Sequence, residues 1–517
     1  MSAFAGGLLE TRARWRGLWP AVAVLLAAAA GALVSYAPAQ PQLVKVGLVS
    51  LAGAALLLLA VRLPVSVLPL AVVVGLLGLG NLELSRIVPV PMLGGQEKWV
   101  LLILAGVAVL GAALDASAPS RLAWPAILLL GGLFLTVCIG SLFYAADREL
   151  ARASVVHQVV QMVALAAGFF WIRRVREARG LVVCLAVIGA MSAALGVWQF
   201  LAPAAFNGVF GRFANQDIRY FMDYWALDIG RVGALWVHAP QFAAFLGILL
   251  PAFLCLWLSR GTLWRALFAI AGFILATITL VLTGTRVEFV GAVAGVVVML
   301  AAWGVRVNSL SRVRAGILST LVAALVVASL LSARGSAESN VFGRLFRLFQ
   351  GDPAAADVVG GRKAVYGALL DTWRSNPILG VGLGNTQEAT ENATAFSGWR
   401  ALTSPHSYYL GLLAQVGLVG TGLVLVMLGA MIPHYRRLLR RAVGSLERAF
   451  GSFALGASVA VLVGGVADNA MLYVWQVGVV FWLLQGAVLS LSLRAEHNLH
   501  ADIDAKEPSG TEALHAG

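Results

Sequence analysis

Long runs of apolar residues, separated by short polar segments, make up most of the chain. Many of them approach the roughly 20 residues that a helix needs to cross about 30 Å of hydrocarbon. Their apolar residues are continuous and do not alternate with polar ones, so helices are predicted rather than strands of a lipid-facing barrel. The candidate spans are residues 19–36, 44–61, 63–79, 99–114, 124–143, 155–172, 181–200, 241–258, 266–282, 287–303, 317–331, 407–432, 453–466 and 472–493.

Composition agrees with this pattern. Of the 517 residues, 60% are hydrophobic and only 12% are charged, and the mean hydropathy is +0.87. Such a chain is typical of a polytopic membrane protein. We therefore predict an all-α helical membrane bundle of about 12 to 14 transmembrane helices with a large helical outside loop.

Arginine clusters predict the orientation. If the N-terminal segment is cytoplasmic, alternation of the spans places the other short basic connections inside as well, as the positive-inside bias requires. These basic residues are Arg12, Arg14, Arg16, Arg173, Arg174, Arg176, Arg179, Arg260, Arg265, Arg306, Arg312, Arg314, Arg436, Arg437, Arg440 and Arg441. Both termini are then cytoplasmic. Ala37-Pro38-Ala39 resembles a signal-peptide cleavage site, but we retain the first span, and its loss would leave the orientation of the others unchanged.

This orientation divides the chain into four parts. Residues 1–200 are N-terminal transmembrane helices, and residues 201–431 form a core with outside loops at 201–240 and 332–405. Residues 432–493 are C-terminal transmembrane helices. Residues 494–517, rich in Asp, Glu, His, Ala and Gly, read as a disordered cytoplasmic tail.

The net charge of +13 is mostly explained by these orienting arginines and does not indicate nucleic-acid binding. The remaining basic residues in the outside loops predict a cavity that attracts an anion, with a solvated basic face as the alternative. Cys138, Cys184 and Cys255 all fall within predicted spans and match no metal spacing. We therefore expect neither a disulfide nor a zinc site.

Arg286 interrupts a long apolar run between Ala266 and Trp303. A cation placed among membrane spans is costly, and it usually binds an anion or lines a wet cavity. The alternative is an arginine that marks the end of a span and extends its charge toward water.

The two outside loops hold the other candidate residues. The first ends in Arg231-Val-Gly-Ala-Leu-Trp236-Val-His238-Ala-Pro240, directly before a span. In the second, apolar residues from Val365 to Trp373 recur at helical spacing, and Pro377 ends this predicted helix. The glycine-rich turn that follows, 379–385, lacks the full spacing of a dinucleotide-binding loop and no strand precedes it.

His406 follows Ser404 and Pro405 at the start of a long apolar helix. Ser404 suits the N-cap and Pro405 the first helical position, so His406 is predicted in the first turn. There the helix dipole and nearby arginines would keep the imidazole neutral and able to accept a proton. Histidine is the commonest general base. The alternative is a histidine that only hydrogen-bonds a neighbouring loop.

These segments occur in an order that resembles the O-antigen ligase and Wzy polymerase superfamily of bacterial envelopes. The resemblance covers about residues 200–427. The motifs that carry it are Arg231-Val-Gly with His238-Ala-Pro240, Leu282-Thr-Gly-Thr-Arg286, Gly361-Arg362 through Trp373 to Asn385, and Pro405-His406-Ser-Tyr-Tyr-Leu410.

The resemblance implies transfer of a glycan from undecaprenyl pyrophosphate to an acceptor hydroxyl at the periplasmic face of the inner membrane. The acceptor would be lipid A core or a second lipid-linked glycan, and membrane lipids would surround the protein. Arg231, Arg286 and Arg362 would bind the pyrophosphate, because a guanidinium can contact two oxygens at once. His406 would be the catalytic base. No metal or other cofactor is required. Possible glycan contacts are His238, Trp236, Tyr366 and Tyr409.

Three alternatives stay open. A Wzy-type polymerase would extend one lipid-linked glycan with another, and a protein O-oligosaccharyltransferase would use a protein hydroxyl. A lipid-linked glycan flippase, which is not an enzyme, would be expected to show internal repeats or charged residues deep in several spans. The charges of this chain instead concentrate in two outside loops.

Overall fold

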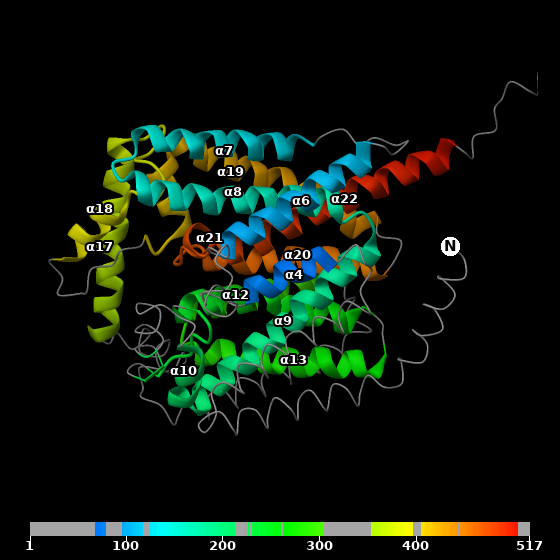
Figure 1. The fold of residues 1–517 in the computed structure, drawn as a ribbon, viewed down its shortest axis with the longest axis horizontal. Helices are drawn as coiled ribbons and strands as arrows, with labels where there is room; N and C mark the ends of the chain where they lie inside the picture. Colours follow the sequence, from blue (N-terminus) through cyan, green and yellow to red (C-terminus); the bar gives the residue numbers. More distant parts are fainter. Residues whose placement is uncertain are drawn as a thin grey trace, which may run out of the picture.

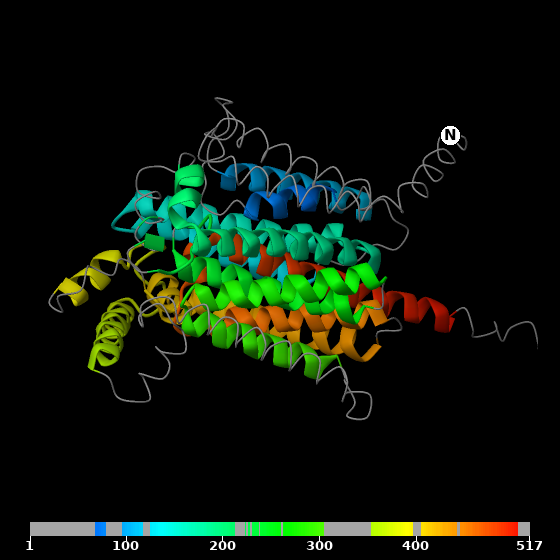
Figure 2. The ribbon, with the colours of Figure 1, turned by 90° about the horizontal axis from the view of Figure 1, so that it is seen from below.

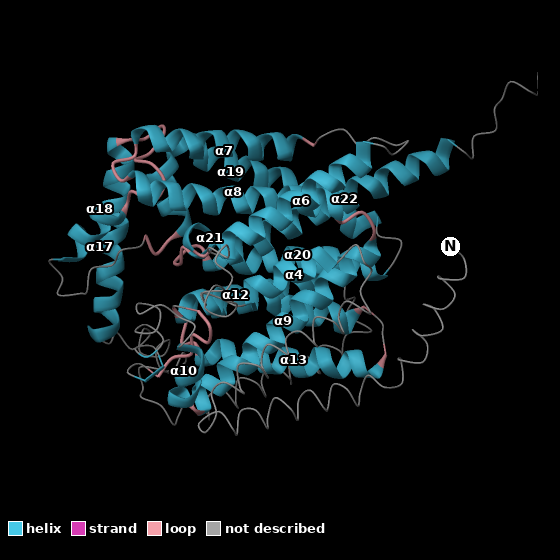
Figure 3. Cartoon of the chain, viewed as in Figure 1, coloured by secondary structure: helices cyan, strands magenta, loops and turns pink. Residues whose placement is uncertain are grey.

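The computed structural model describes residues 68–78, 96–116, 125–211, 223, 226–227, 230–236, 238–259, 262–303, 353–395, 405–441 and 445–504. Every regular element in these ranges is a helix (Figure 3), which confirms the predicted all-α class. The helices are α4 (Leu68–Gly78), α6 (Gln96–Ala116), α7 (Ala126–Tyr144), α8 (Arg148–Trp171), α9 (Val175–Leu201), α10 (Pro203–Phe210), α12 (Ala239–Leu258), α13 (Leu263–Leu282), α14 (Arg286–Ala302), α17 (Pro353–Ser375), α18 (Gln387–Ala395), α19 (Tyr408–Arg441), α20 (Ser445–Gly464), α21 (Ala470–Tyr473) and α22 (Trp475–Asp504).

Among the described residues, eight helices are long and apolar enough to cross a membrane: α7, α8, α9, α12, α13, α19, α20 and α22. The chain is therefore a multi-pass membrane protein, as predicted. The candidate spans at 19–36, 44–61 and 317–331, and residues 63–67 of the span 63–79, lie outside the described residues. Each of the other spans overlaps a helix, except that the span 472–493 begins in α21 and continues in α22. Cys138, Cys184 and Cys255 are buried inside α7, α9 and α12.

Small residues bring the central helices close together. A Cβ atom added at Gly295 of α14 would collide with the Gly456 carbonyl of α20, and one added at Gly456 would collide with the Gly295 carbonyl. Gly168 of α8 faces the Leu483 carbonyl of α22 in the same way. In a membrane, helices associate largely through such close backbone packing. The glycines therefore fix how deeply α14 and α20 interlock.

The two ends of the bundle differ. Helices α10, α17, α18 and α21 lie at one end, which we call the site end (Figure 1). Figure 2 shows α17 and α18 beyond the ends of the long helices. The described arginines predicted to face the cytoplasm lie at the opposite end: Arg173, Arg174, Arg176 and Arg179 where α8 meets α9, Arg265 in the first turn of α13, and Arg436, Arg437, Arg440 and Arg441 in the last turns of α19.

The glycine-rich turn packs against a break in α19. At Gly417 the helix has φ 62° and ψ −163°, which is not helical. Leu418 N–H donates to the Pro377 carbonyl (2.9 Å) and Val419 N–H to the Ile378 carbonyl (3.1 Å). Further hydrogen bonds run from the turn to α19: Val381 N–H to the Ala414 carbonyl (3.0 Å) and Gly382 N–H to the Gln415 carbonyl (2.9 Å). The glycines of this turn therefore serve close backbone packing.

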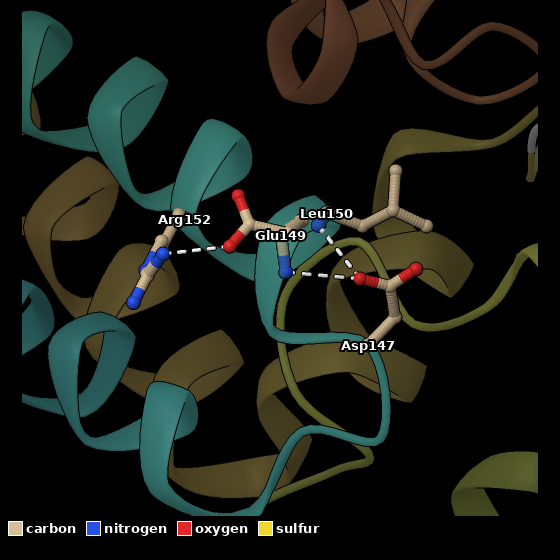
Figure 4. A network of polar contacts seen from close by, with 4 residues as sticks. All are labelled: Asp147, Glu149, Leu150 and Arg152. Atoms are coloured by element: carbon tan, nitrogen blue, oxygen red, sulfur yellow. Dashed lines mark hydrogen bonds and ion pairs between the residues drawn. The ribbon is translucent and has the colours of Figure 1, made fainter.

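The same turn is fastened to the connection between α7 and α8. Tyr144 Oη donates to the Leu379 carbonyl (2.9 Å), and Asp147 N–H donates to Asn385 Oδ1 (2.6 Å). Asp147 also caps α8, because its Oδ1 accepts from Glu149 N–H (2.9 Å) and Leu150 N–H (3.0 Å), as Figure 4 shows. Anchored on both sides, the turn holds the C-terminal end of α17 in place.

The break at Gly417 yields a test of the fold. Gly417→Ala should lower the thermal stability of the detergent-solubilised protein, because alanine in this glycine-only conformation costs on the order of 1 to 3 kcal/mol. A Cβ there would also collide with the Ile378 carbonyl. Gly422→Ala, five residues later in the same helix with open space around its Cα, is the matched control and should leave the melting temperature unchanged or raise it. Equal effects of both variants would contradict the role given to the break.

Candidate functional site

Arg231 joins the turn that precedes Arg286. Its side chain is only 7% exposed. Arg231 Nε donates to the Thr283 carbonyl oxygen (2.6 Å), and Arg231 Nη2 donates to Thr285 Oγ1 (2.9 Å). Thr285 is the N-cap residue of α14, which begins at Arg286. The structure thus brings together the first two segments that carry the family resemblance.

Gln199, near the end of α9, supports the loop that presents Arg231. Its Oε1 accepts hydrogen bonds from Gly233 N–H (2.9 Å) and Ala234 N–H (2.7 Å). Ala234 has φ 47°, a left-handed conformation that is uncommon for a residue with a side chain. The buried glutamine therefore satisfies two backbone donors in a turn that the sequence alone does not favour.

His406 does not lie in the first turn of a helix, so that part of the sequence prediction is wrong. Helix α19 begins at Tyr408, and His406 has a left-handed φ of 50°. Tyr408 N–H donates to the carbonyl oxygens of Gly465 (2.9 Å) and Asp468 (2.8 Å), which places the start of the helix there. Ser407 Oγ accepts from Leu410 N–H at 3.5 Å, the capping contact that was expected of Ser404. Ser404 lies outside the described residues.

Helix α17 places two side chains beside His406. Tyr366 Oη donates to the His406 carbonyl oxygen (3.1 Å). Arg362 lies one turn earlier on α17, and its positive charge acts on His406. Val365 and Leu369 pack against Ala414 and keep α17 on the beginning of α19. The helix predicted within the second loop is therefore confirmed, and it covers His406.

The imidazole of His406 is held neutral. Burial, together with the charges of Arg362 and His238, lowers the pKa of His406 to about 4. Burial also lowers the pKa of His238, the N-cap residue of α12, to about 4. The neutral state agrees with the sequence prediction, but its main cause is burial and not a helix dipole. The two histidines lie close enough for their charges to interact.

A pair of carboxyl groups completes the cluster. Glu288, in the first turn of α14, is 3% exposed, and its carboxyl is hydrogen-bonded to that of Asp468 in the α20–α21 connection. Burial raises the pKa of Asp468, while Asn469 N–H, Glu288 and Arg362 act in the opposite direction. Sequence reasoning singled out neither acid. The sequence feature that could have identified Glu288 as a site residue is its position inside the apolar run that contains Arg286.

The residues described above form one connected cluster at the site end. Arg231 binds the turn before Arg286, and the helix that starts there carries Glu288 to Asp468. Asp468 lies near Arg362, whose charge also acts on His406. His406 in turn lies near His238, seven residues after Arg231. Side chains from five separate segments thus surround one region.

Two expected glycan contacts are directed elsewhere. Trp236 is 1% exposed, and its ring packs on Phe245 with centroids 4.7 Å apart, so no face is open for a sugar. Tyr409 is half-buried, and its Oη donates to the Leu462 carbonyl (2.7 Å). We do not include these two residues in the candidate site. In the part of the chain that the structure describes, no group of three or more His, Cys, Asp or Glu side chains is placed to hold a metal ion.

The fold and the site define a multi-pass α-helical membrane protein with a buried cluster of arginine, histidine and carboxyl groups at one end of its bundle. Residues 271–425 match the family model described as O-antigen ligase, which confirms the resemblance to the O-antigen ligase and Wzy polymerase superfamily. The matched segment contains Arg286, Arg362 and His406, whereas Arg231 and His238 precede it. A comparison with curated proteins finds no match.

The lowered histidine pKa values predict a pH dependence of stability. The ordinary pKa is near 6.5, so between pH 6.5 and 4 the unfolded chain binds protons that the folded chain does not. Stability should fall as the pH decreases through this window, by on the order of 1 to 3 kcal/mol for each histidine. His238→Asn should unfold with a weaker pH dependence over the same window, measured by thermal unfolding at pH 7 and pH 5. An unchanged pH dependence would show that His238 is not buried neutral.

Proposed function

We propose that the protein is an O-antigen ligase-like glycan transferase. It would move a polysaccharide from undecaprenyl pyrophosphate to a hydroxyl of lipid A core, at the periplasmic face of the bacterial inner membrane. The family match supports a glycan-processing role of the ligase or polymerase kind. The observation that carries the proposal is the meeting of the Arg231, Arg286, Arg362 and His406 segments at the site end, opposite the basic clusters that we predict to be cytoplasmic.

The reaction follows from these groups. The acceptor hydroxyl attacks the anomeric carbon, the bond from that carbon to the phosphate oxygen breaks, and the hydroxyl proton passes to His406. Negative charge accumulates on the leaving lipid pyrophosphate, so fixed guanidinium groups would stabilise the transition state more than the ground state. Arg231, Arg286 and Arg362 suit this role because arginine stays charged when partly desolvated. A neutral, buried His406 suits the role of proton acceptor. The scheme requires no metal.

Other reactions on the same donor remain alternatives. A Wzy-type polymerase would use a second lipid-linked glycan as acceptor, and a protein O-oligosaccharyltransferase would use a protein hydroxyl. The same arginines and the same base serve all three. A lipid-linked glycan flippase is less favoured, because it has no need of a base beside an anion site. The closeness of a buried neutral histidine, His406, to the cation Arg362 supports the transfer reaction instead.

A deletion strain tests the proposal and the role of His406 together. Loss of a ligase should leave long glycan chains on the carrier lipid, whereas loss of a polymerase should leave single repeat units. Complementation with the wild type should restore surface glycan, and His406→Ala should not, because a general base contributes about 10²- to 10⁴-fold. His434→Ala is the matched control, since His434 lies near the other end of α19 and contacts Ser492. Full complementation by His406→Ala would exclude His406 as the base.

Arg286 and Arg231 provide a second mutational test. Arg286→Lys should support little transfer, because an ammonium cannot reproduce the two-pronged contact of a guanidinium. Arg286→Ala and Arg231→Ala should each weaken donor use about tenfold or more, and the double variant should lose less than the product of the two factors. Arg152→Ala, an exposed arginine of α8, is the control. If the losses of the two single variants multiply in the double variant, or if Arg286→Lys is fully active, Arg286 would be a cation that only marks the end of a span.

A further inference from the structure

Glu288 and Asp468 form a hydrogen-bonded carboxyl pair inside a membrane protein. Two ionised carboxylates repel each other and contain only hydrogen-bond acceptors. A hydrogen bond between them therefore requires that one carboxyl carries a proton. The pair then has a single negative charge.

The surroundings assign the proton to Glu288. Asp468 Oδ1 accepts from Asn469 N–H (2.6 Å), and the guanidinium of Arg362 acts on the same carboxylate, so the negative charge is best accommodated there. Glu288 is the more buried of the two, and Glu288 Oε1 has no hydrogen-bond partner among the described residues. An ionised group in that position would be strongly disfavoured.

Close packing keeps Glu288 in this position. A Cβ added at Gly464, the last residue of α20, would collide with the Glu288 carboxyl group. The glycine therefore makes room for the acid at the point where α20 ends and the connection to Asp468 begins. Because α14 and α20 interlock through Gly295 and Gly456, the carboxyl of Glu288 is presented to Asp468 by the backbone packing of two helices.

We propose that Glu288 is a positioning residue whose neutral carboxylic acid donates a hydrogen bond to Asp468, so that the Asp468 carboxylate holds Arg362 beside His406. The inference rests on the proposed function, since Arg362 is assigned there to the donor pyrophosphate. Arginine has several rotatable bonds, and Arg362 lies on α17 outside the long helices. A fixed carboxylate whose charge acts on Arg362 would reduce the entropy lost when the donor binds.

The protonation state can be tested on the purified wild-type protein without any activity assay. We expect the infrared spectrum at neutral pH to contain the C=O band of a protonated carboxylic acid, shifted when glutamate is labelled with ¹³C at the carboxyl. That component should be absent from Glu288→Gln and unchanged in Glu149→Gln, an exposed glutamate of α8. Identical spectra of the wild type and Glu288→Gln would overturn the proposal.

Transfer kinetics test the positioning role. Glutamine can donate the same hydrogen bond, so Glu288→Gln should retain transfer within about threefold, whereas Glu288→Leu leaves Asp468 without that donor and should lose about ten- to hundredfold in kcat/KM. The loss should appear mainly as a higher KM for the lipid-linked donor, and Asp468→Asn should reproduce it. Inactive Glu288→Gln, or equal activity of Glu288→Gln and Glu288→Leu, would overturn the proposal. An inactive wild type that shows the infrared band would count only against the proposed function.

Discussion

The hydrogen bonds between segment 377–382 and the interrupted helix α19 hold the site end together. Inside a bilayer, backbone donors and acceptors released by a helix break must find partners within the protein. Here the Pro377 and Ile378 carbonyls accept hydrogen bonds from the two backbone N–H groups that follow the break at Gly417. The glycine-rich turn makes further backbone hydrogen bonds to α19. Because this turn directly follows α17, it fixes the position of the C-terminal end of α17 on the bundle. The positions of Arg362 and Tyr366 relative to His406 depend on that anchor.

A second set of constraints comes from the buried polar groups. Arg231 is satisfied by the turn before α14, and Gln199 satisfies the backbone of the loop that carries Arg231. Glu288 reaches Asp468 where Gly464 leaves room for its carboxyl, between two helices that pack closely through glycines. The site is thus assembled from segments distant in sequence, each of which completes the hydrogen bonding of another. A change in helix packing would therefore also alter the chemistry of the site.

Much of this arrangement was predictable from the sequence, and the exceptions have physical causes. The apolar runs identified the helices, and the spacing from Val365 to Trp373 identified α17, because each depends on local periodicity. The start of α19 was misplaced, because Tyr408 N–H finds acceptors in Gly465 and Asp468 that no local pattern reveals. The carboxyl pair was missed for the same reason. Only tertiary packing turns two isolated acids in apolar surroundings into one hydrogen-bonded unit.

Arg362 has two opposing consequences for the proposed chemistry. Burial is the main cause of the low pKa of His406, and the charge of Arg362 adds to it. Both keep the imidazole free of a proton, but a histidine with a pKa near 4 is a weak base. In the proposed reaction the donor pyrophosphate would bring negative charge to the same arginine. An anion near a histidine favours its protonated form, so donor binding would raise the pKa of His406 toward its ordinary value. The base would then become more effective when the leaving group is in place, which would favour transfer from a correctly placed donor.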